Sequence, residues 1–358
     1  MLTTADELRR VSADRLRDFM NEAFRACGLP AADAATVAEA MLDADLSGSD
    51  AHGVFRLPGY VRLLKRGKFN PRAEMRVVAR GPATALIDGD NGMGHLVMTF
   101  AANTAVEIAR ATGIGWVGTR RSNHAGAGST YAAIPLAQGM IGIYAAVSGS
   151  NFMAPWGGAE PLLGTNPIAV AIPAGREAPV VLDIATSVAS NGAIRARALE
   201  GKPLPEGWLI SRADGTPITD PARIDEGLFA PIGGYKGSGL SLVLGLLAGP
   251  LNGAAFGRDI KESVSEQVRE TNTGQLIIAV DIGRFIAPDI FAAEVDRHLR
   301  DLAVSAPLPG VDRIHLPGQG RQARRAERSR DGVPLSAELL KQLDGVAKAL
   351  GITRLQRE

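Results

Sequence analysis

Hydrophobic residues near the start of this 358-residue chain recur at every third or fourth position, which is the spacing of amphipathic helices. A first helix is predicted to begin after Ser12, whose hydroxyl can cap it, and to end at Gly28. A second helix is predicted over residues 32–44. A third helical stretch reaches Lys65, and Pro58 within it either opens the helix or kinks it.

From about residue 74 the pattern changes, and short apolar runs alternate with helical stretches as far as about residue 249. This alternation favours an α/β sandwich around a sheet that is at least partly parallel. The predicted strands are 75–79, 84–88, 115–119, 141–146, 167–172 and 180–183, and the predicted helices are 95–112, 129–138, 188–199 and 238–247. Beyond residue 253 we predict a strand over 276–280, a helix over 289–302, a long Pro-, Gly- and Arg-rich connection over 306–330 and a final helix over 335–350.

The composition is that of an ordinary globular protein, with 46% hydrophobic and 22% charged residues. A net charge of +1 provides no field for nucleic acid, so we expect no nucleic-acid partner. No apolar run is long enough to span a bilayer, and the N-terminal segment has no signal-peptide pattern, so we expect no membrane association. Cys27 is the only cysteine, which excludes an intramolecular disulfide and fits a cytoplasmic protein.

The five histidines lie far apart in the sequence and form no metal-binding motif, so no metal site is expected. His95, His298 and His315 are interpreted as structural, because they fall at a helix start, in an amphipathic helix and in a loop. His52 and His124 are the two candidates for chemistry.

The segment from Gly113 to Gly118 matches the dinucleotide-binding pattern G-x-G-x-x-G, but its context is reversed. That fingerprint must leave a strand and open a helix, so that the pyrophosphate meets the helix N-terminus. Here a helix is predicted to end at Thr112 and a strand to begin near Gly115, with Gly113 as a left-handed helix stop. We therefore infer no Rossmann site.

The turn near residue 50 carries an imidazole and a guanidinium. Histidine suits proton transfer because its ordinary pKa is near neutral pH, and the planar fork of arginine matches a carboxylate. His52, Arg56 and Tyr60 are four residues apart, so a helix would place them on one face, with Tyr60 toward substrate. The alternative is an exposed His and Arg at a helix entrance.

A second group of polar residues follows predicted strands. His124 lies in a loop between a strand and a helix, where it is either catalytic or an ordinary hydrogen-bonded histidine. Asp183 ends an apolar strand and needs a partner, and a histidine partner would be oriented by it. Thr186 and Ser187 are predicted to cap the next helix, where the same amides also suit a phosphate.

The glycine-rich segment before residue 238 opens another helix, but its spacing departs from that of a phosphate loop, so an ATPase is rejected. Lys236 within it remains a candidate contact for a dinucleotide. Arg321, Arg324 and Arg325 can reach a 2′-phosphate, although a solvated basic loop is the preferred interpretation.

Eight segments resemble, in order and over nearly the whole chain, the malate/L-lactate dehydrogenase family that is unrelated to the Rossmann-type enzymes of the same names. They are DAHGVFRLPGYV, DGDNGMGH, RRSNHAGAGSTYA, MAPWGGAEPLLGTNPIAVAIP, VVLDIATS, GWLISRADGTPITDP, PIGGYKGSGLSLVL and IHLPGQG. Each is weak by itself, and together they are specific.

This resemblance implies an α/β fold with a non-Rossmann, mixed-sheet NAD(P)-binding domain and a helical domain built from both termini, like that of sulfolactate dehydrogenase. The implied division is 1–73 for the N-terminal helical part, 74–249 for the nucleotide domain and 250–358 for a C-terminal part that packs with the N-terminal helices. It also implies a homodimer, with the site between the domains near the dimer interface.

The implied reaction transfers a hydride between NAD or NADP and C2 of a small 2-oxo or 2-hydroxy acid. The resemblance makes His52 the acid/base residue, oriented by Asp183, with Arg56 on the substrate carboxylate. It places His124 either in catalysis or against the nicotinamide. Thr165 would contact substrate, and the cofactor would meet Thr186, Ser187, Tyr235, Lys236, Pro317 and Gly318.

Three residues depart from the family pattern. Ala51 replaces the usual serine before the first histidine, Ala125 replaces a bulky aromatic, and Gln319 replaces an acidic residue in the Pro-Gly-Glu turn. The alternatives are therefore a reductase of cyclic ketimines such as piperideine- or pyrroline-2-carboxylate, and a nucleotide-binding relative with weakened catalysis.

Overall fold

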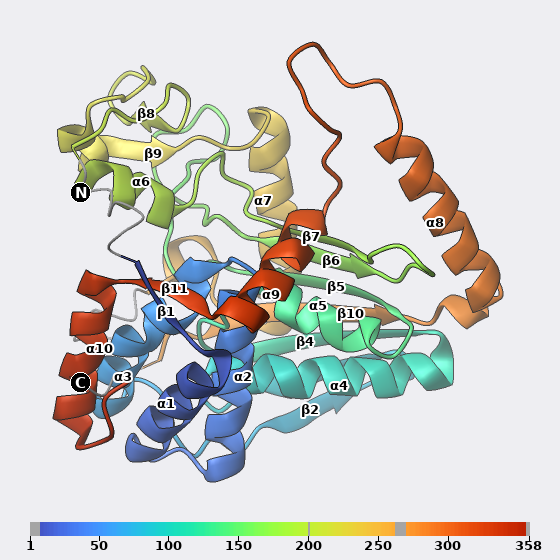
Figure 1. Ribbon diagram of the computed structural model, residues 1–358, viewed down its shortest axis with the longest axis horizontal. Helices are drawn as coiled ribbons and strands as arrows, with labels where there is room; N and C mark the ends of the chain where they lie inside the picture. The colour runs from blue at the N-terminus through green and yellow to red at the C-terminus, as the bar shows by residue number, and fades with distance from the viewer. Residues whose placement is uncertain (1–7, 200, 262–269, 356–358) are drawn as a thin grey trace.

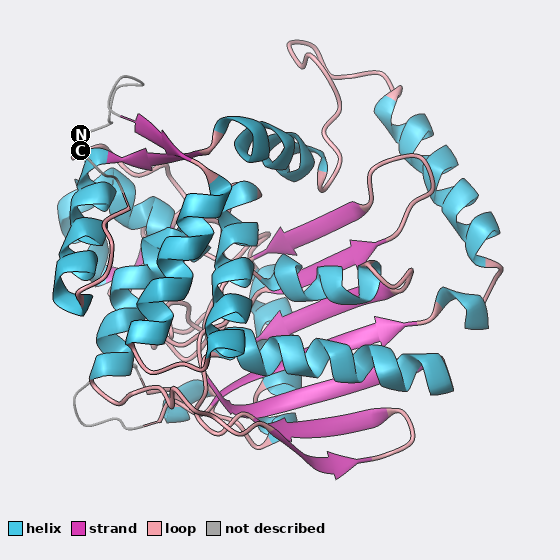
Figure 2. Ribbon diagram, turned by 60° about the horizontal axis from the view of Figure 1, so that its bottom comes forward, coloured by secondary structure: helices cyan, strands magenta, loops and turns pink. Residues whose placement is uncertain are grey.

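The computed structural model describes residues 8–199, 201–261 and 270–355. Its centre is a seven-stranded mixed sheet, with helices on both faces and a helical part at one end (Figures 1 and 2). The strands of this sheet are β2 (Arg76–Arg80), β3 (Thr84–Asp88), β4 (Ile114–Ser122), β5 (Ile141–Ala146), β6 (Ile168–Ile172), β7 (Val180–Ile184) and β10 (Thr273–Val280).

The strand order is β2-β3-β4-β10-β5-β6-β7, which makes β7 an edge strand. Only β3 and β4 are parallel, and every other neighbouring pair in this sheet is antiparallel. The mixed-sheet prediction is confirmed. β10 lies between β4 and β5, so part of the expected C-terminal segment belongs to the central sheet and not to the terminal helices.

Alternation along the strands separates the two faces of the sheet. Helices α4 (Gly94–Thr112) and α5 (Gly128–Leu136) cover one face, where Tyr144 and Ala146 of β5 are buried (Figure 2). The intervening Ala145 faces α7 (Tyr235–Ala248) on the other side. Gly113 adopts the left-handed conformation predicted for it, with φ +90°, between the end of α4 and the start of β4. The reversed context of the glycine pattern is confirmed.

The helical part contains segments from both ends of the chain, side by side in Figure 1. Strand β1 (Leu8–Val11) pairs antiparallel with β11 (Val333–Ser336). Their neighbours share one hydrophobic core, and they are α1 (Ala13–Ala26), α2 (Ala31–Leu46), α3 (Leu57–Lys65) and α10 (Ala337–Leu350). Pro58 lies in the first turn of α3, so it opens that helix.

The connection predicted over 306–330 contains a helix, α9 (Gln319–Asp331). The prediction was wrong because α9 has almost no apolar residues, and its inner side is held by ion pairs with α2. Arg321 and Arg325 both pair with Asp43, so the preferred interpretation of a solvated basic loop was also wrong for them.

The remaining elements surround the sheet. The hairpin of β8 (Leu209–Ser211) and β9 (Gly227–Phe229) packs near α6 (Asn191–Leu199), and α8 (Pro288–Ala303) projects at the side of the molecule in Figure 1. Within the described ranges, no helix has both the length and the apolar character needed to cross a membrane.

Candidate active site

The turn that carries His52 consists of two short 3-10 turns, Asp50–His52 and Val54–Arg56, directly before α3. His52, Arg56 and Tyr60 therefore do not share one helical face as predicted, because α3 begins only at Leu57. Arg56 is exposed and donates from Nε to the Ala51 carbonyl over 2.8 Å.

Asp45, at the end of α2, holds this turn in place. The residue is 1% exposed, and its Oδ2 accepts a hydrogen bond from the Val54 amide at 2.8 Å. Gly53 lies against the same carboxylate, and a β-carbon there would be 2.5 Å from Oδ2 and closer still to Oδ1. Burial raises the pKa of Asp45 to about 8. The sequence contains no sign of this contact, which requires glycine after the histidine.

Two histidines contact Tyr60, and a third stacks on one of them. The His52 and His124 rings are stacked with centroids 5.7 Å apart and 9° between their planes. The Tyr60 hydroxyl shares a 2.5 Å hydrogen bond with His124 Nδ1, and the Tyr60 ring meets His95 edge-on at 5.3 Å. The structure thus brings together the two histidines singled out for chemistry and adds His95, which was expected to be structural.

The electrostatic surroundings keep these imidazoles neutral. Burial lowers the pKa of His52, the charge of Arg56 lowers it further, and Asp183 opposes both. Burial lowers the pKa of His95 to about 3, and that of His124 well below its ordinary value. His52 is also the only one of the three whose pKa a carboxylate raises, which marks it as the imidazole suited to gain and lose a proton.

His95 is 1% exposed, and neither of its ring nitrogens has a hydrogen-bond partner. Gly126 lies beside it with φ +73°, and a β-carbon on Gly126 would be 3.0 Å from His95 Nε2. The loop that carries His124 therefore approaches His95 closely.

Asp183 lies on the edge strand β7 and is exposed in the chain, not buried as predicted. Its partner is Ser129 at the start of α5, which donates to Asp183 Oδ2 from the amide at 2.9 Å and from the hydroxyl at 2.6 Å. No hydrogen bond joins Asp183 to His52 among the described contacts, and its influence on His52 is electrostatic.

Thr186 and Ser187 do not cap a helix. Helix α6 begins at Asn191, and Ser190 accepts from the Ala193 amide instead. The amide and hydroxyl of Thr186 both donate to the Thr165 carbonyl, at 2.9 Å each. The Ile232 amide donates to the Thr186 carbonyl, which joins this segment to the loop before α7.

The start of α7 is exposed and follows a left-handed glycine. Gly234 has φ +66° and lies against the Trp156 ring, and Trp156 and Tyr235 are 65% and 63% exposed. Lys236 is exposed in the first turn, where a cation and free helix amides suit a phosphate. The Pro317 carbonyl contacts the Val181 amide at 3.4 Å, so the Pro317–Gly318 turn borders the other end of β7 from Asp183.

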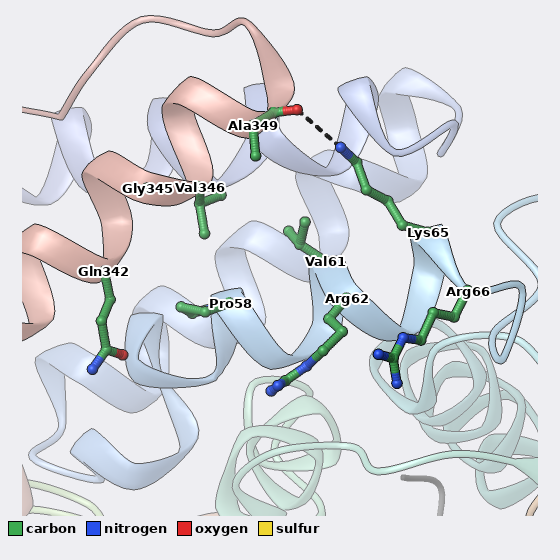
Figure 3. Close-up of a pocket in the computed structure, with 9 residues that line it drawn as sticks. All are labelled: Pro58, Val61, Arg62, Lys65, Arg66, Gln342, Gly345, Val346 and Ala349. Carbon is green, nitrogen blue, oxygen red and sulfur yellow. Dashed lines mark hydrogen bonds between the residues drawn. The ribbon is translucent and has the colours of Figure 1, made fainter. Parts of the chain in front are cut away.

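A groove of about 560 Å³ lies elsewhere, between α3 and α10 (Figure 3). Arg62, Lys65 and Arg66 line it, and Lys65 donates to the Ala349 carbonyl at 2.9 Å. None of the candidate site residues lines this groove. Within the described parts of the chain, no three His, Cys, Asp or Glu side chains are grouped to hold a metal ion.

Comparison with known proteins decides the family. The sequence profile of the malate/L-lactate dehydrogenase family matches residues 11–344. The chain belongs to this family. It is 37% identical to L-sulfolactate dehydrogenase of Methanocaldococcus jannaschii over 91% of this chain and 92% of that protein. It is 33% identical to a Δ1-pyrroline-2-carboxylate/Δ1-piperideine-2-carboxylate reductase of Pseudomonas syringae pv. tomato, over 94% and 96% of the two chains.

The fold agrees with a solved member of the family. Malate dehydrogenase from Pyrococcus horikoshii OT3 superposes with a TM-score of 0.90 at 32% identity, over 99% of each chain. The chain is thus an oxidoreductase of the hydroxy-acid dehydrogenase type, with the non-Rossmann fold that the motifs predicted.

Several residues next to the site were not predicted to contribute to it. Asp45, His95 and Ser129 contact the candidate site residues or the turn that carries them, and Arg321 contacts Ser129. His95 and Ser129 stand in two of the motifs, which is the one signal that could have found them, and Asp45 has none. His298 and His315 are exposed, on α8 and in the loop after it.

Proposed function

We propose that this enzyme interconverts a small 2-hydroxy acid and the corresponding 2-oxo acid with NAD or NADP, and that His52 exchanges the proton at the C2 oxygen. The observation that carries the proposal is the stacking of His52 on His124, in a turn that also carries Arg56 and within electrostatic reach of Asp183. A neutral imidazole there accepts a proton from a hydroxyl, and the nearby carboxylate stabilises the imidazolium that forms.

The remaining residues receive roles from their positions. Arg56 pairs with the substrate carboxylate, because its exposed guanidinium lies beside His52 and presents several donors in one plane. Tyr60 fixes the His124 ring through their hydrogen bond, and Thr165 faces substrate. The nicotinamide, when bound, supplies or accepts the hydride. Thr186, Ser187, Tyr235, Lys236, Pro317 and Gly318 would hold the dinucleotide.

A His52→Ala variant tests this assignment. We expect its turnover to fall by about 10²–10⁴-fold while cofactor binding persists, because only the proton transfer is removed. His298→Ala is the matched control, since His298 is exposed on α8. Turnover is measured with NADH and NADPH on a panel of 2-oxo acids. Wild-type rates for His52→Ala would remove the proposed mechanism.

The alternative substrate is a cyclic ketimine, favoured by the small Ala51 and Ala125 beside the two histidines and by the similar reductase. The same Arg56 and proton donor serve C=N as well as C=O, so the panel includes piperideine- and pyrroline-2-carboxylate. Turnover of the imines alone would establish the reductase. Binding of cofactor with no turnover on either class would indicate a weakened enzyme.

We also propose a homodimer. Helix α7 exposes Leu242, Val243 and Leu246, and the arm that carries α8 exposes Phe285 and Val304. Exposed apolar side chains of this kind, on one helix and on a projecting arm, are typical of surfaces that a second copy covers. Light scattering of the wild-type chain and of a Val243→Glu variant tests this, and a monomeric wild type would refute it.

We also propose that the protein is cytoplasmic, which is consistent with the single free Cys27.

A further inference from the structure

We propose that Arg321 of α9 is a positioning residue for the carboxylate of Asp183, and that it acts through the hydroxyl of Ser129. This inference rests on the proposed function, since it concerns the carboxylate proposed to stabilise the His52 imidazolium. Arg321 lies 138 residues beyond Asp183 in the sequence, on the helix that the sequence analysis did not predict.

A continuous chain of hydrogen bonds connects the two residues. Arg321 Nη1 donates to Ser129 Oγ at 2.7 Å, and Ser129 Oγ donates to Asp183 Oδ2 at 2.6 Å. The Ser129 amide donates to the same Asp183 oxygen at 2.9 Å. Ser129 is completely buried, so water does not compete with these partners for its hydroxyl.

The guanidinium is fixed from its other side as well. Arg321 Nη2 forms a 2.7 Å ion pair with Asp43 Oδ2 of α2, and Thr130 donates to that oxygen at 2.8 Å. Arg325 pairs with the second oxygen of Asp43. The Arg321 side chain is only 20% exposed. Both ends of the planar fork are therefore engaged, and Arg321 is held too firmly to serve as a free cation for a cofactor phosphate.

These contacts decide where the serine proton points. A hydroxyl has one donor, and a cationic donor that occupies its lone pair directs that proton toward the opposite acceptor. Asp183 lies on an edge strand, and among the described residues the two hydrogen bonds from Ser129 hold its Oδ2. Without Arg321 the hydroxyl is free to rotate, and the carboxylate loses one of its two constraints.

The effect is expected at His52. Asp183 raises the pKa of His52 against burial and Arg56, and His95 and His124 are the other titratable groups beside that ring. A displaced Asp183 would support the imidazolium less. We therefore expect the apparent pKa of His52 to fall when Arg321 is replaced.

The experiment compares Arg321→Gln with Arg325→Gln, a matched control that removes a second arginine from the same Asp43 but does not reach Ser129. Arg321→Gln should lower kcat/KM by about tenfold with little change in cofactor KM, as is usual when catalytic groups are displaced by a fraction of an ångström. Arg325→Gln should stay within about twofold of wild type. Arg321→Lys, which keeps the charge but not the fork, should lose activity like Arg321→Gln and provides a well-folded second variant.

A double-mutant cycle with Ser129→Ala identifies the path. The double variant Arg321→Gln/Ser129→Ala should be no slower than the worse single variant. By contrast, the fold-reductions in kcat/KM caused by Arg325→Gln and by Ser129→Ala should multiply when the two are combined. Multiplicative effects for Arg321 and Ser129, a higher apparent pKa for His52, or a loss confined to the KM for NADPH would each overturn the proposal. The last two would indicate a remote charge or a phosphate contact.

The two proposals fail separately. If His52→Ala retains activity, the proposed function fails whatever Arg321 does. If His52→Ala is inactive while Arg321→Gln and Arg321→Lys keep full activity, only the positioning role fails.

Discussion

Replacing Gly53 by alanine should disrupt the turn that carries His52 and Arg56. The new β-carbon would lie 2.5 Å from Asp45 Oδ2 and closer still to Oδ1, whereas ordinary contact begins near 3.4 Å. Asp45 is buried in α2, so relief requires its carboxylate to leave the Val54 amide or the whole turn to move. The first route leaves a buried N–H unpaired, at about 1–3 kcal/mol, and also removes the partner of a buried carboxyl group.

We therefore expect Gly53→Ala to lower the free energy of unfolding by about 2–4 kcal/mol, which corresponds to a fall in Tm of several degrees. Turnover should fall further than stability alone explains, because His52 moves with the turn. Gly59→Ala is the control. Gly59 lies six residues later in α3 with nothing near its missing β-carbon, so alanine there should be neutral or stabilise the helix by up to about 1 kcal/mol.

The origin of the cost is tested by combining the change with Asp45→Ala. This second substitution removes the carboxylate that the new methyl group meets, so Gly53→Ala should cost little in that background. Thermal melts and urea unfolding of the four proteins measure the coupling. If the two penalties simply add, or if Gly53→Ala melts like Gly59→Ala, the contact with Asp45 does not explain the glycine.

Three further predictions concern the same site. Tyr60→Phe removes the hydroxyl that is hydrogen-bonded to His124 Nδ1, so kcat should fall about tenfold while Tm stays nearly unchanged. An unaltered kcat in steady-state kinetics would contradict this. For reduction His52 must carry a proton, so kcat/KM should fall as the pH rises through a pKa below the ordinary value. Arg56→Gln should move that limb to higher pH, and a pH profile that stays in place would rule out the coupling. Asp45 has a folded-state pKa of about 8, above its unfolded value, so stability should decline by up to about 1 kcal/mol per pH unit as the pH rises from 4 toward 8. Asp45→Asn should flatten this dependence in melts across that range.

Much of the fold was predictable because its apolar pattern is regular. The strands of the central sheet and the helices α4 and α10 lie within a few residues of their predicted positions. Helix α9 was missed because its packing depends on ion pairs, and a run such as Arg321–Arg330 has no apolar period to read. The position of β10 between β4 and β5 was also missed, since periodicity contains no information about strand order.

The site was predictable in its residue types and less so in its geometry. His52, His124 and Tyr60 were chosen from their motifs, and they lie together in the structure. The contacts that position them come from residues distant in sequence, such as Asp45 and Arg321, whose roles depend on burial and on partners. No local sequence pattern distinguishes an aspartate that faces solvent from one that supports a buried turn.

The late position of β10 in the chain has a consequence for biosynthesis. During translation β4 and β5 emerge with their facing edges unsatisfied, and they remain so until about 130 further residues have left the ribosome. The nascent polypeptide therefore exposes two open strand edges for several seconds at ordinary elongation rates, a period in which chaperones would protect it from mispairing. The pairing of β1 with β11 must come later still, so the first ordered strand to be synthesised is among the last to find its place.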